Sequence, residues 1–439
     1  MASVAAPAPI VSNTDIKTPT DWSSSEMNAR IKGRYRSEAI FKYLGLGALA
    51  LAAAFLAFLL FTVIGGGASG FSATEVKVTV TYDAAALGID PAAARGPGGK
   101  AAIQVGDFQG LATRAATSLG EGADIISEGG WLALREAVIE DPSLLGKTVQ
   151  VWIPVKSKID LLAKEKYDLD EPELTRGVSD VEVAQYNALA KRGLVRTIFN
   201  TNFLKAADST DAELAGIWGA AKGSLLTLLV TLVLSFPIGI FAAIYLEEFA
   251  PKNRWTDMVE VSINNLAAVP SIIFGLLGLA VFLNFFNMPR SAPLVGGLTL
   301  ALMTFPVIVI AGRVAIKAVP PSIRDAALGV GASPVQVVFQ HVLPLALPGI
   351  LTGTIIGMSR ALGETAPLLL IGMNAFVSDA PEGLTSSASV LPVQVYLWSD
   401  NVQRGFVEKT STAIIVLLVF LLLMNSVAIY LRNRFERRW

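Results

Sequence analysis

The chain has 439 residues, of which 53% are hydrophobic, and its mean hydropathy is +0.55. This composition excludes an ordinary soluble protein and predicts an integral membrane protein. The chain contains no cysteine, which excludes disulfides, thiolate metal sites and a cysteine nucleophile. With 35 basic and 36 acidic residues the net charge is −1, so the total charge gives no basis for nucleic-acid binding.

The amino-terminal region is polar. Its first 26 residues are rich in Ala, Pro, Ser and Thr, and we expect a disordered cytoplasmic tail over residues 1–40. The uncharged stretch over residues 43–74 is long enough to cross a bilayer core of about 30 Å, which predicts a first transmembrane helix over residues 41–66. A cleaved signal peptide is the alternative, because residues 65–69 are small, but the leading segment is far too long for one.

Five further apolar segments predict five more crossings, over residues 223–246, 261–285, 293–312, 344–374 and 410–431. The predicted fold is therefore an all-α polytopic membrane protein of six transmembrane helices. Short cytoplasmic loops carry an excess of Lys and Arg. Such residues precede the first helix and follow the second, fourth and sixth, so we expect a multi-pass protein with both termini in the cytoplasm.

Residues 67–220, between the first two helices, are polar and long enough to form their own core outside the membrane. Val76, Val78 and Val80 alternate with polar residues, and residues 149–153 repeat this pattern, which predicts two half-buried strands. Helical periodicity dominates residues 160–190. We expect a small α+β extracytoplasmic domain, followed by a membrane core over residues 221–439.

Residues 317–344, between the fourth and fifth helices, carry helix start and stop signals. Ser322 and Asp325 predict a capping box, and Gly331 is placed to end this helix in a left-handed conformation. Ser333 and Pro334 start a second short helix. Two capped helices joined by a glycine predict a rigid elbow that transmits force between subunits, although an ordinary amphipathic linker has the same local signals.

Two charged residues interrupt the predicted fifth helix. Arg360 and Glu364 are four residues apart, and Arg360 is about 24 Å along from Pro344, where a charge is costly unless it is paired or faces water. A guanidinium offers a forked set of donors for an oxyanion, and Glu364 would moderate its field so that the anion can leave. The pair predicts a substrate path, with a structural ion pair between helices as the alternative.

Small residues recur within the predicted helices. A residue without a side chain lets two helix backbones approach closely, so these glycines predict close helix packing. They are Gly275, Gly278, Gly349, Gly353 and Gly357.

The elbow resembles the EAA loop of ABC-importer permeases, which reads E-A-A-x3-G-x9-I-x-L-P. Asp325 stands at the position of the family's Glu, and His341 stands at the position of its Ile. The lone histidine is interpreted as a helix-surface residue, because a metal site needs further ligands. The resemblance implies that the elbow docks on a cytoplasmic ATPase subunit. The coupling residues that it implies are Ser322, Asp325, Ala326, Ala327 and Gly331.

Three further segments are similar to A-type permeases of phosphate ABC transporters. They are residues 245–248, 270–275 and 360–367, the last reading R-A-L-G-E-T-A-P. This resemblance covers about residues 216–439. It implies import of inorganic phosphate together with a second homologous permease, two ATPase subunits and a periplasmic phosphate-binding protein. Many family members carry an Arg-x-x-Glu pair late in the fourth helix, where this chain has residues 310–313, so that pair is not transferred.

The chain has no nucleotide-binding motif, so we expect ATP hydrolysis on a separate subunit, no enzymatic activity in this chain, and no cofactor or metal.

A permease for another oxyanion is one alternative. An ion-coupled secondary transporter with Glu364 as its proton site is another, although the six spans show no inverted repeat. A sensor built on the external domain is disfavoured because only short loops and tails face the cytoplasm. Two binding roles for residues 67–220 stay open, namely docking a binding protein and packing against a sister permease. The permease pair is either homomeric or heteromeric.

Overall fold

The computed structural model describes residues 23–96 and 98–435. The predicted tail up to residue 22, residue 97 and the last four residues lie outside this range. The chain divides into two compact units, Met1–Thr62 and Val63–Trp439. Helix α1 (Ser25–Gly67) accounts for the described part of the first unit.

Helix α1 is longer than the predicted first span. It begins at Ser25, which corrects the disorder expected for residues 25–40. The Ser24 hydroxyl accepts a hydrogen bond from the Met27 N–H at 3.3 Å, and Glu26 pairs with Arg30 at 3.5 Å. An end cap and an i,i+4 ion pair both support a helix in a polar segment, and they extend α1 beyond its apolar part.

Five helical segments within the described residues are long and apolar enough to cross a membrane, and one bent pair of helices brings the possible number to six. The first contains α1. The other four contain α11 (Trp218–Ile244), α14 (Pro293–Lys317), α17 (Leu343–Gly363) and α20 (Arg404–Phe435). These helices confirm the predicted all-α polytopic core.

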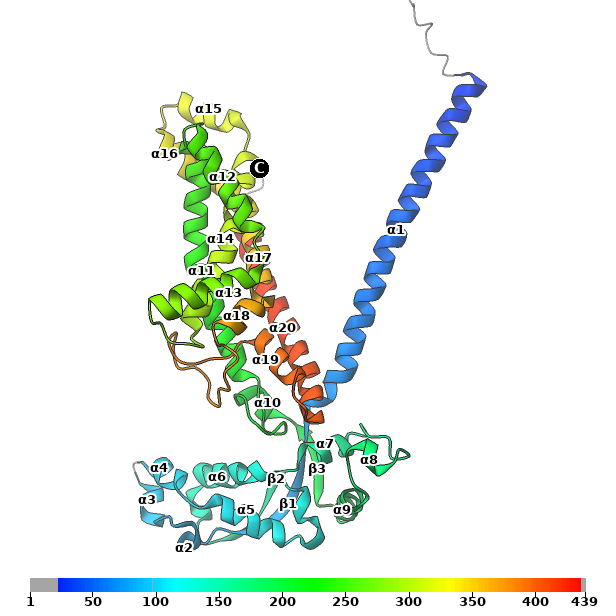
Figure 1. The fold of residues 1–439 in the computed structure, drawn as a ribbon, viewed down its shortest axis with the longest axis vertical. Helices are drawn as coiled ribbons and strands as arrows, with labels where there is room; N and C mark the ends of the chain where they lie inside the picture. The colour runs from blue at the N-terminus through cyan, green and yellow to red at the C-terminus, as the bar shows by residue number, and fades with distance from the viewer. Residues whose placement is uncertain (1–22, 97, 436–439) are drawn as a thin grey trace, which may run out of the picture. The chain divides into compact units, whose positions relative to one another are not determined.

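The predicted third span, residues 261–285, is not one straight helix. Helix α12 (Arg254–Ala267) and helix α13 (Ser271–Leu277) meet at 102°, and α13 continues as the π-helical segment η6 (Gly278–Phe285). Pro270 lies at the bend, where its missing N–H and the restriction that it places on the preceding residue prevent a continuous helix. As a result α13 runs across the bundle and packs against α18 (Ala366–Leu370) (Figure 1).

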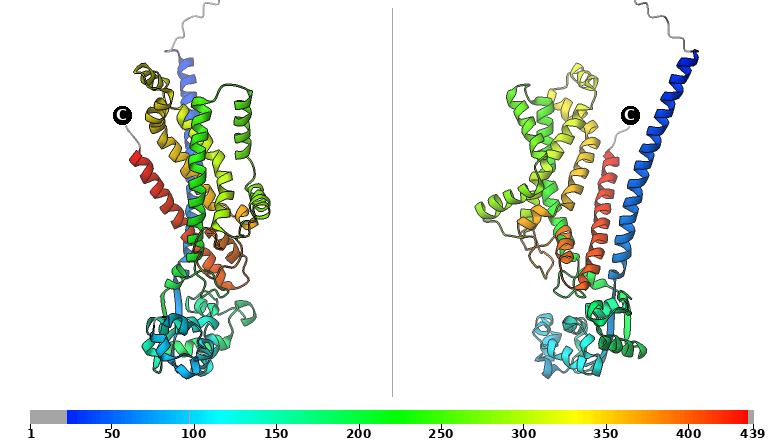
Figure 2. Two further views of the ribbon diagram at one scale, coloured as in Figure 1. Left: turned by 90° about the vertical axis from the view of Figure 1, so that its left-hand side faces the viewer. Right: turned by 45° about the vertical axis from the view of Figure 1, so that its right-hand side comes forward.

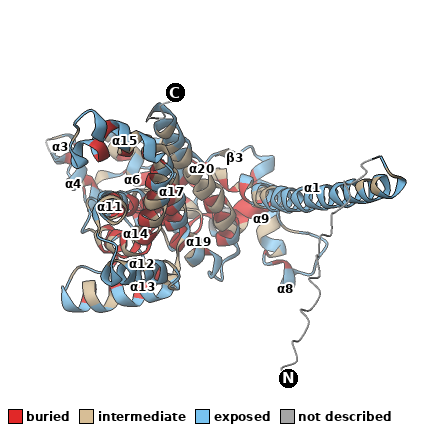
Figure 3. Ribbon diagram, turned by 90° about the horizontal axis from the view of Figure 1, so that it is seen from above, coloured by how far each residue is buried: buried red, intermediate tan, exposed pale blue. Residues whose placement is uncertain are grey.

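Helix α14 is the centre of the bundle in the second unit. It packs against both α11 and α17, and Figure 3 shows buried residues concentrated on these three helices. A side-chain carbon at Gly349 would lie 2.7 Å from Ala315 Cβ, and one at Gly353 would overlap Ala311 Cβ. The predicted close packing at these glycines is confirmed.

The insert, residues 67–220, contains a three-stranded antiparallel sheet of order β2-β1-β3. Strands β1 (Ser72–Thr81) and β2 (Thr148–Pro154) confirm the two predicted strands, with Val78 opposite Val151. Strand β3 (Val195–Phe199) was not predicted, because no residue of this edge strand is fully buried and its sequence lacks a clear alternation. Val76, Val78 and Val80 are buried in the core of the insert as the alternation predicted.

Short helices surround this sheet. The predicted helical region, residues 160–190, is broken into three helices by a loop that contains Pro172 and by Gly177, which has a φ of 83°. The α-helices of the insert are α2 (Ala84–Leu87), α3 (Pro91–Arg95), α4 (Gly99–Gln104), α5 (Phe108–Thr117), α6 (Trp131–Glu140), α7 (Ser157–Ala163), α8 (Glu173–Arg176), α9 (Asp180–Lys191) and α10 (Thr201–Lys205). The 3-10 turns are η1 (Ala68–Phe71), η2 (Gly120–Ile125), η3 (Glu128–Gly130) and η4 (Pro142–Leu144).

The two ends of the insert lie side by side. The Asn200 N–H donates a hydrogen bond to the Phe71 carbonyl at 2.7 Å, and the rings of Phe71 and Phe203 meet edge to face at 5.8 Å. The first and last segments of the insert therefore meet at one place.

A buried group of charges joins the insert to the first turns of α20. Lys164 Nζ lies 2.6 Å from Asp160 Oδ2 and 3.0 Å from Glu408 Oε2, and all three side chains are at most 10% exposed. Asp160 also accepts a hydrogen bond from the Thr74 N–H at 2.8 Å. Lys409 is buried next to this group and lies 5.0 Å above the Phe203 ring. We call Asp160, Lys164, Glu408 and Lys409 the ionic clasp.

Replacing Lys164 by methionine removes the cation that bridges Asp160 and Glu408. We expect the free energy of unfolding to fall by about 3 kcal/mol, because breaking a buried pair leaves an uncompensated charge. A urea titration of the solubilised protein, followed by tryptophan fluorescence, measures this. Lys166→Met is the matched control, since Lys166 is exposed in the adjacent loop. If both variants unfold at the same urea concentration as the wild type, the clasp does not stabilise the junction.

Candidate functional site

Helix α17 ends earlier than the predicted fifth span, which was expected to continue to residue 374. It stops at Gly363, and Glu364 follows in an extended conformation with φ −77° and ψ 116°. Pro367 explains the stop, because it lacks the N–H that would bond to the Gly363 carbonyl four residues earlier, and its ring crowds that carbonyl. Arg360 therefore lies in the last turn of α17, and Glu364 lies just beyond the helix.

The structure nevertheless brings Arg360 and Glu364 together. Arg360 Nε lies 3.4 Å from Glu364 Oε1, with the Arg360 side chain 51% exposed and the Glu364 side chain 18% exposed. Within the described residues, the two terminal nitrogens of Arg360 make no hydrogen bond. One edge of the guanidinium is thus paired, and its fork is free to bind an oxyanion on a face of α17 that the described residues of the second unit leave exposed.

Helix α17 is fixed beside Arg360 by a contact with α20. The Ser359 hydroxyl donates a hydrogen bond to Asn425 Oδ1 at 2.7 Å, and the two helices pack along their length. Movement of either helix therefore alters the position of the Arg360 guanidinium.

The elbow, residues 317–344, consists of two short helices. Helix α15 (Pro321–Gly329) is followed by Gly331, whose φ of 91° confirms the predicted left-handed end. Helix α16 (Pro334–Gln336) begins with a capping box between Ser333 and Gln336, as predicted for its start. It continues through the π-helical segment η7 (Val337–Val342) directly into α17.

The predicted capping box of Ser322 with Asp325 is wrong. Helix α15 begins at Pro321 with Pro320 as its N-cap, and no side chain caps it. The fixed φ of proline starts the helix two residues earlier than expected, so Ser322 lies inside the first turn. Ser322 and Asp325 are both exposed on the elbow surface.

The predicted coupling residues differ in exposure. Ser322, Asp325, Ala326 and Gly331 are exposed, whereas Ala327 is buried in the apolar cluster that also contains Val337 and Val342. Ala327 therefore attaches the elbow to the bundle, while the other four residues face outward. The exposed face also carries Leu328 and Val330, the latter 86% exposed, and His341 is exposed as expected.

Two arginines make ion pairs that the sequence did not reveal, one between the elbow and the bundle and one within the bundle. Arg324 of α15 binds Glu248, with Nη2 2.6 Å from Oε1, and it also donates to the carbonyls of Val319 and Ile316. Arg313 of α14 binds Glu260 of α12 at 2.6 Å and Glu247 at 3.3 Å. We call these pairs the ionic struts.

The struts depend on a local change of helix geometry. Glu247 and Glu248 lie in the π-helical turn η5 (Tyr245–Phe249) that ends α11. Adjacent residues in a helix point in different directions, so each glutamate reaches a different arginine. Such single π-turns are frequent at functional sites. The segment Tyr245-Leu246-Glu247-Glu248 was noted in the sequence, but partners 66 and 76 residues away leave no local signal.

Two families match parts of the chain. Binding-protein-dependent transport system inner membrane component matches residues 235–439, and Domain of unknown function (DUF3333) matches residues 28–173.

Individual proteins also match. The phosphate transport system permease protein PstA 1 of Mycobacterium tuberculosis is 30% identical over 225 residues, which cover 51% of this chain and 72% of that protein. The probable ABC transporter permease protein YqgI of Bacillus subtilis is 29% identical over 244 residues, which cover 52% of this chain and 82% of that protein. A solved structure of the MetNI methionine ABC transporter in an inward-facing conformation is 19% identical, with a TM-score of 0.39, and the match covers 50% of this chain and 98% of that one.

Replacing Glu248 by glutamine removes the charge that holds Arg324. Hydrogen bonds to charged groups contribute about 1.5–3 kcal/mol, so we expect the elbow to become more mobile. The natural absence of cysteine allows a single spin label at Val330→Cys, and the width of its electron paramagnetic resonance lines reports this motion. Glu382→Gln, at an exposed loop residue, is the control. Unchanged lines in the Glu248 variant would show that the strut does not hold the elbow.

Proposed function

This chain belongs to the family of binding-protein-dependent inner-membrane transport permeases that includes phosphate transport system permeases, and we propose that it is the transmembrane permease subunit of an ATP-driven importer of inorganic phosphate. It works with a second homologous permease, two cytoplasmic ATPase subunits and an extracytoplasmic phosphate-binding protein. ATP hydrolysis belongs to the ATPase subunits.

The arrangement of the second unit supports an orientation in the membrane. The elbow lies at one end of this unit and the insert lies at the other (Figure 1, Figure 2). The carboxyl end of α20, with Arg432 and Arg434, lies at the elbow end, as does the loop with Lys252. By the rule that cytoplasmic loops are rich in basic residues, the elbow and the carboxyl terminus face the cytoplasm and the insert faces outward.

The observation that carries the proposal is the free fork of Arg360. A permanently charged guanidinium within an apolar helix is costly unless it binds an anion or faces water. Its fork matches two oxygens of a tetrahedral oxyanion, and Glu364 on its other edge limits how tightly that anion is held. Because Arg360 lies on an uncovered face of α17, the second permease closes the path from the opposite side.

The elbow supplies the connection to the ATPase subunits. Its exposed residues Ser322, Asp325, Ala326 and Gly331 contact the ATPase, and Ala327 secures the elbow to the bundle. The continuous path from α16 through η7 into α17 leads from this contact to Arg360. The ionic struts pass the same movement to α11, α12 and α14.

Arg360→Gln removes the charge and keeps a polar, though shorter, side chain. We expect phosphate uptake to fall by about tenfold or more, because a charged hydrogen bond is lost at the path. Radiolabelled phosphate uptake into proteoliposomes measures this, and co-purification of the ATPase subunits checks assembly. Arg290→Gln, an exposed arginine, should transport at the wild-type rate within about a factor of two. Wild-type uptake by the Arg360 variant would reject the assigned path.

The energy source distinguishes this proposal from an ion-coupled transporter. In proteoliposomes loaded with ATP, uptake should stop when the ATPase subunits carry a substitution that blocks hydrolysis. A proton gradient without ATP should not drive phosphate uptake. Uptake driven by the gradient alone would instead identify Glu364 as a proton site. Excess sulfate as competitor tests whether another oxyanion is preferred.

A further inference from the structure

A cleft lies where the insert meets the start of α20, and the transport path described above does not use it. Its volume is about 520 Å³, which is within the range of natural binding sites. Residues of the insert, the segment before α11 and the first turn of α20 line it together. We call it the junction cleft, and the lining residues used below are Glu128, Lys156, Tyr167, Asp211, Gln403 and Arg404.

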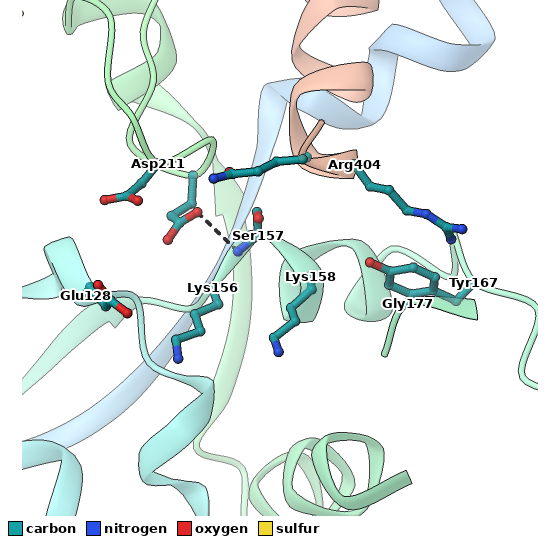
Figure 4. A pocket seen from close by; sticks show the side chains of 11 residues that line it. Glu128, Lys156, Ser157, Lys158, Tyr167, Gly177, Asp211 and Arg404 are labelled. Carbon is teal, nitrogen blue, oxygen red and sulfur yellow. Dashed lines mark hydrogen bonds between the residues drawn. The ribbon is translucent and has the colours of Figure 1, made fainter. Parts of the chain in front are cut away.

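The junction cleft separates its charges. Glu128 and Asp211 lie on one side, Arg404 and Tyr167 lie on the other, and Lys156 lies between them (Figure 4). The cleft therefore has an acidic wall and a basic wall, and a matching ligand carries both signs of charge.

Some of these charged groups are already paired, and others are free. Arg404 donates hydrogen bonds to the carbonyls of Arg176 and Thr175, at 2.8 and 3.1 Å. Within the described part of the chain, the side chains of Glu128, Lys156 and Asp211 make no hydrogen bond or ion pair. Burial, and then the negative charge of Glu128, raise the pKa of Asp211 above its usual value. A cation placed against this wall would relieve that repulsion.

The charge pattern limits the occupant. A phosphate ion would meet the carboxylates of Glu128, Asp211 and Glu213, so free phosphate is disfavoured. A permanent contact with a sister permease would be mainly apolar, because obligate interfaces resemble a protein core. A soluble partner that binds and leaves in every cycle instead uses complementary charges, which accelerate its encounter and fix its orientation.

We propose that the junction cleft is a docking site for the phosphate-binding protein of this importer, which places a loop with one basic and one acidic side chain in it. The basic side chain pairs with Glu128 and Asp211, and the acidic side chain pairs with Lys156. This inference rests on the proposed function, because it requires a binding protein that delivers phosphate.

The position of the cleft gives docking a route to the transport path. Gln403 and Arg404 belong to the cleft, and Glu408 of the ionic clasp lies one helical turn further along α20. The clasp makes the insert and α20 move together, and Asn425 of α20 bonds to Ser359, the neighbour of Arg360. A loop that fills the cleft also lies against Gln403 and Arg404, so it favours one position of α20 and, through it, one position of α17.

Charge reversal tests the docking site. We expect Lys156→Glu and Asp211→Lys each to weaken binding of the phosphate-loaded binding protein to the assembled complex in nanodiscs by about tenfold, with the larger loss at low salt. Biolayer interferometry at low and high salt measures the Kd. Lys191→Glu is the matched control on the exposed surface of the insert and should stay within about twofold of the wild type. Lys156→Gln, a milder change, should weaken binding in the same direction, and the thermal midpoint of each complex shows that the variants fold.

Crosslinking with purified components identifies the occupant. A photoreactive thiol reagent on Gln403→Cys should capture the binding protein, and the same reagent on Lys191→Cys should not. Crosslinks from Gln403→Cys to the sister permease alone, or Kd values unchanged by both charge reversals, would overturn the docking site. If the wild-type complex does not import phosphate, the proposed function fails. If it imports phosphate while the charge reversals leave the Kd unchanged, only the docking inference fails.

Discussion

An ionised side chain that leaves water needs an opposite charge or a hydrogen-bond partner, and this requirement determines where the chain places its buried charges. The ionic clasp satisfies it at the junction of the insert and α20, and the ionic struts satisfy it where the elbow meets α11, α12 and α14. Arg360 differs, because Glu364 pairs with one edge of its guanidinium and the fork stays free. Under the proposed function, this incompletely paired cation is the group that would bind the transported anion.

These three groups of charges lie along a connected set of helices. The elbow continues into α17, α17 packs against α20, and α20 is joined to the insert. Helix packing through glycine contacts such as Gly353 with Ala311 leaves little space for independent movement of α14 and α17. A displacement of the elbow and an event at the insert can therefore both change the position of Arg360.

Local patterns predicted the elements that depend on local physics. The valine alternation predicted β1, and the long apolar segments predicted the long helices. The glycine at position 331 predicted the end of α15. Prolines caused the main errors, because Pro270 bends a predicted span, Pro321 moves the start of α15, and Pro367 follows an early end of α17.

The struts were missed since Arg324 and Glu248 are far apart in sequence, and the pairing of Lys164 with Glu408 spans an even greater separation. For the candidate site, the sequence predicted that Arg360 and Glu364 are neighbours, but the free fork is a property of the folded chain.

The insert begins and ends at one point, where Phe71 and Asn200 are hydrogen bonded. A segment with adjacent ends can be added to or removed from a host protein without changing the direction of the flanking helices. Permeases with and without such a domain can therefore share one ancestral membrane scaffold, and the domain can be exchanged as a unit between them. The surface that it presents outside the membrane is then free to diversify while the helices that carry the anion remain under separate selection.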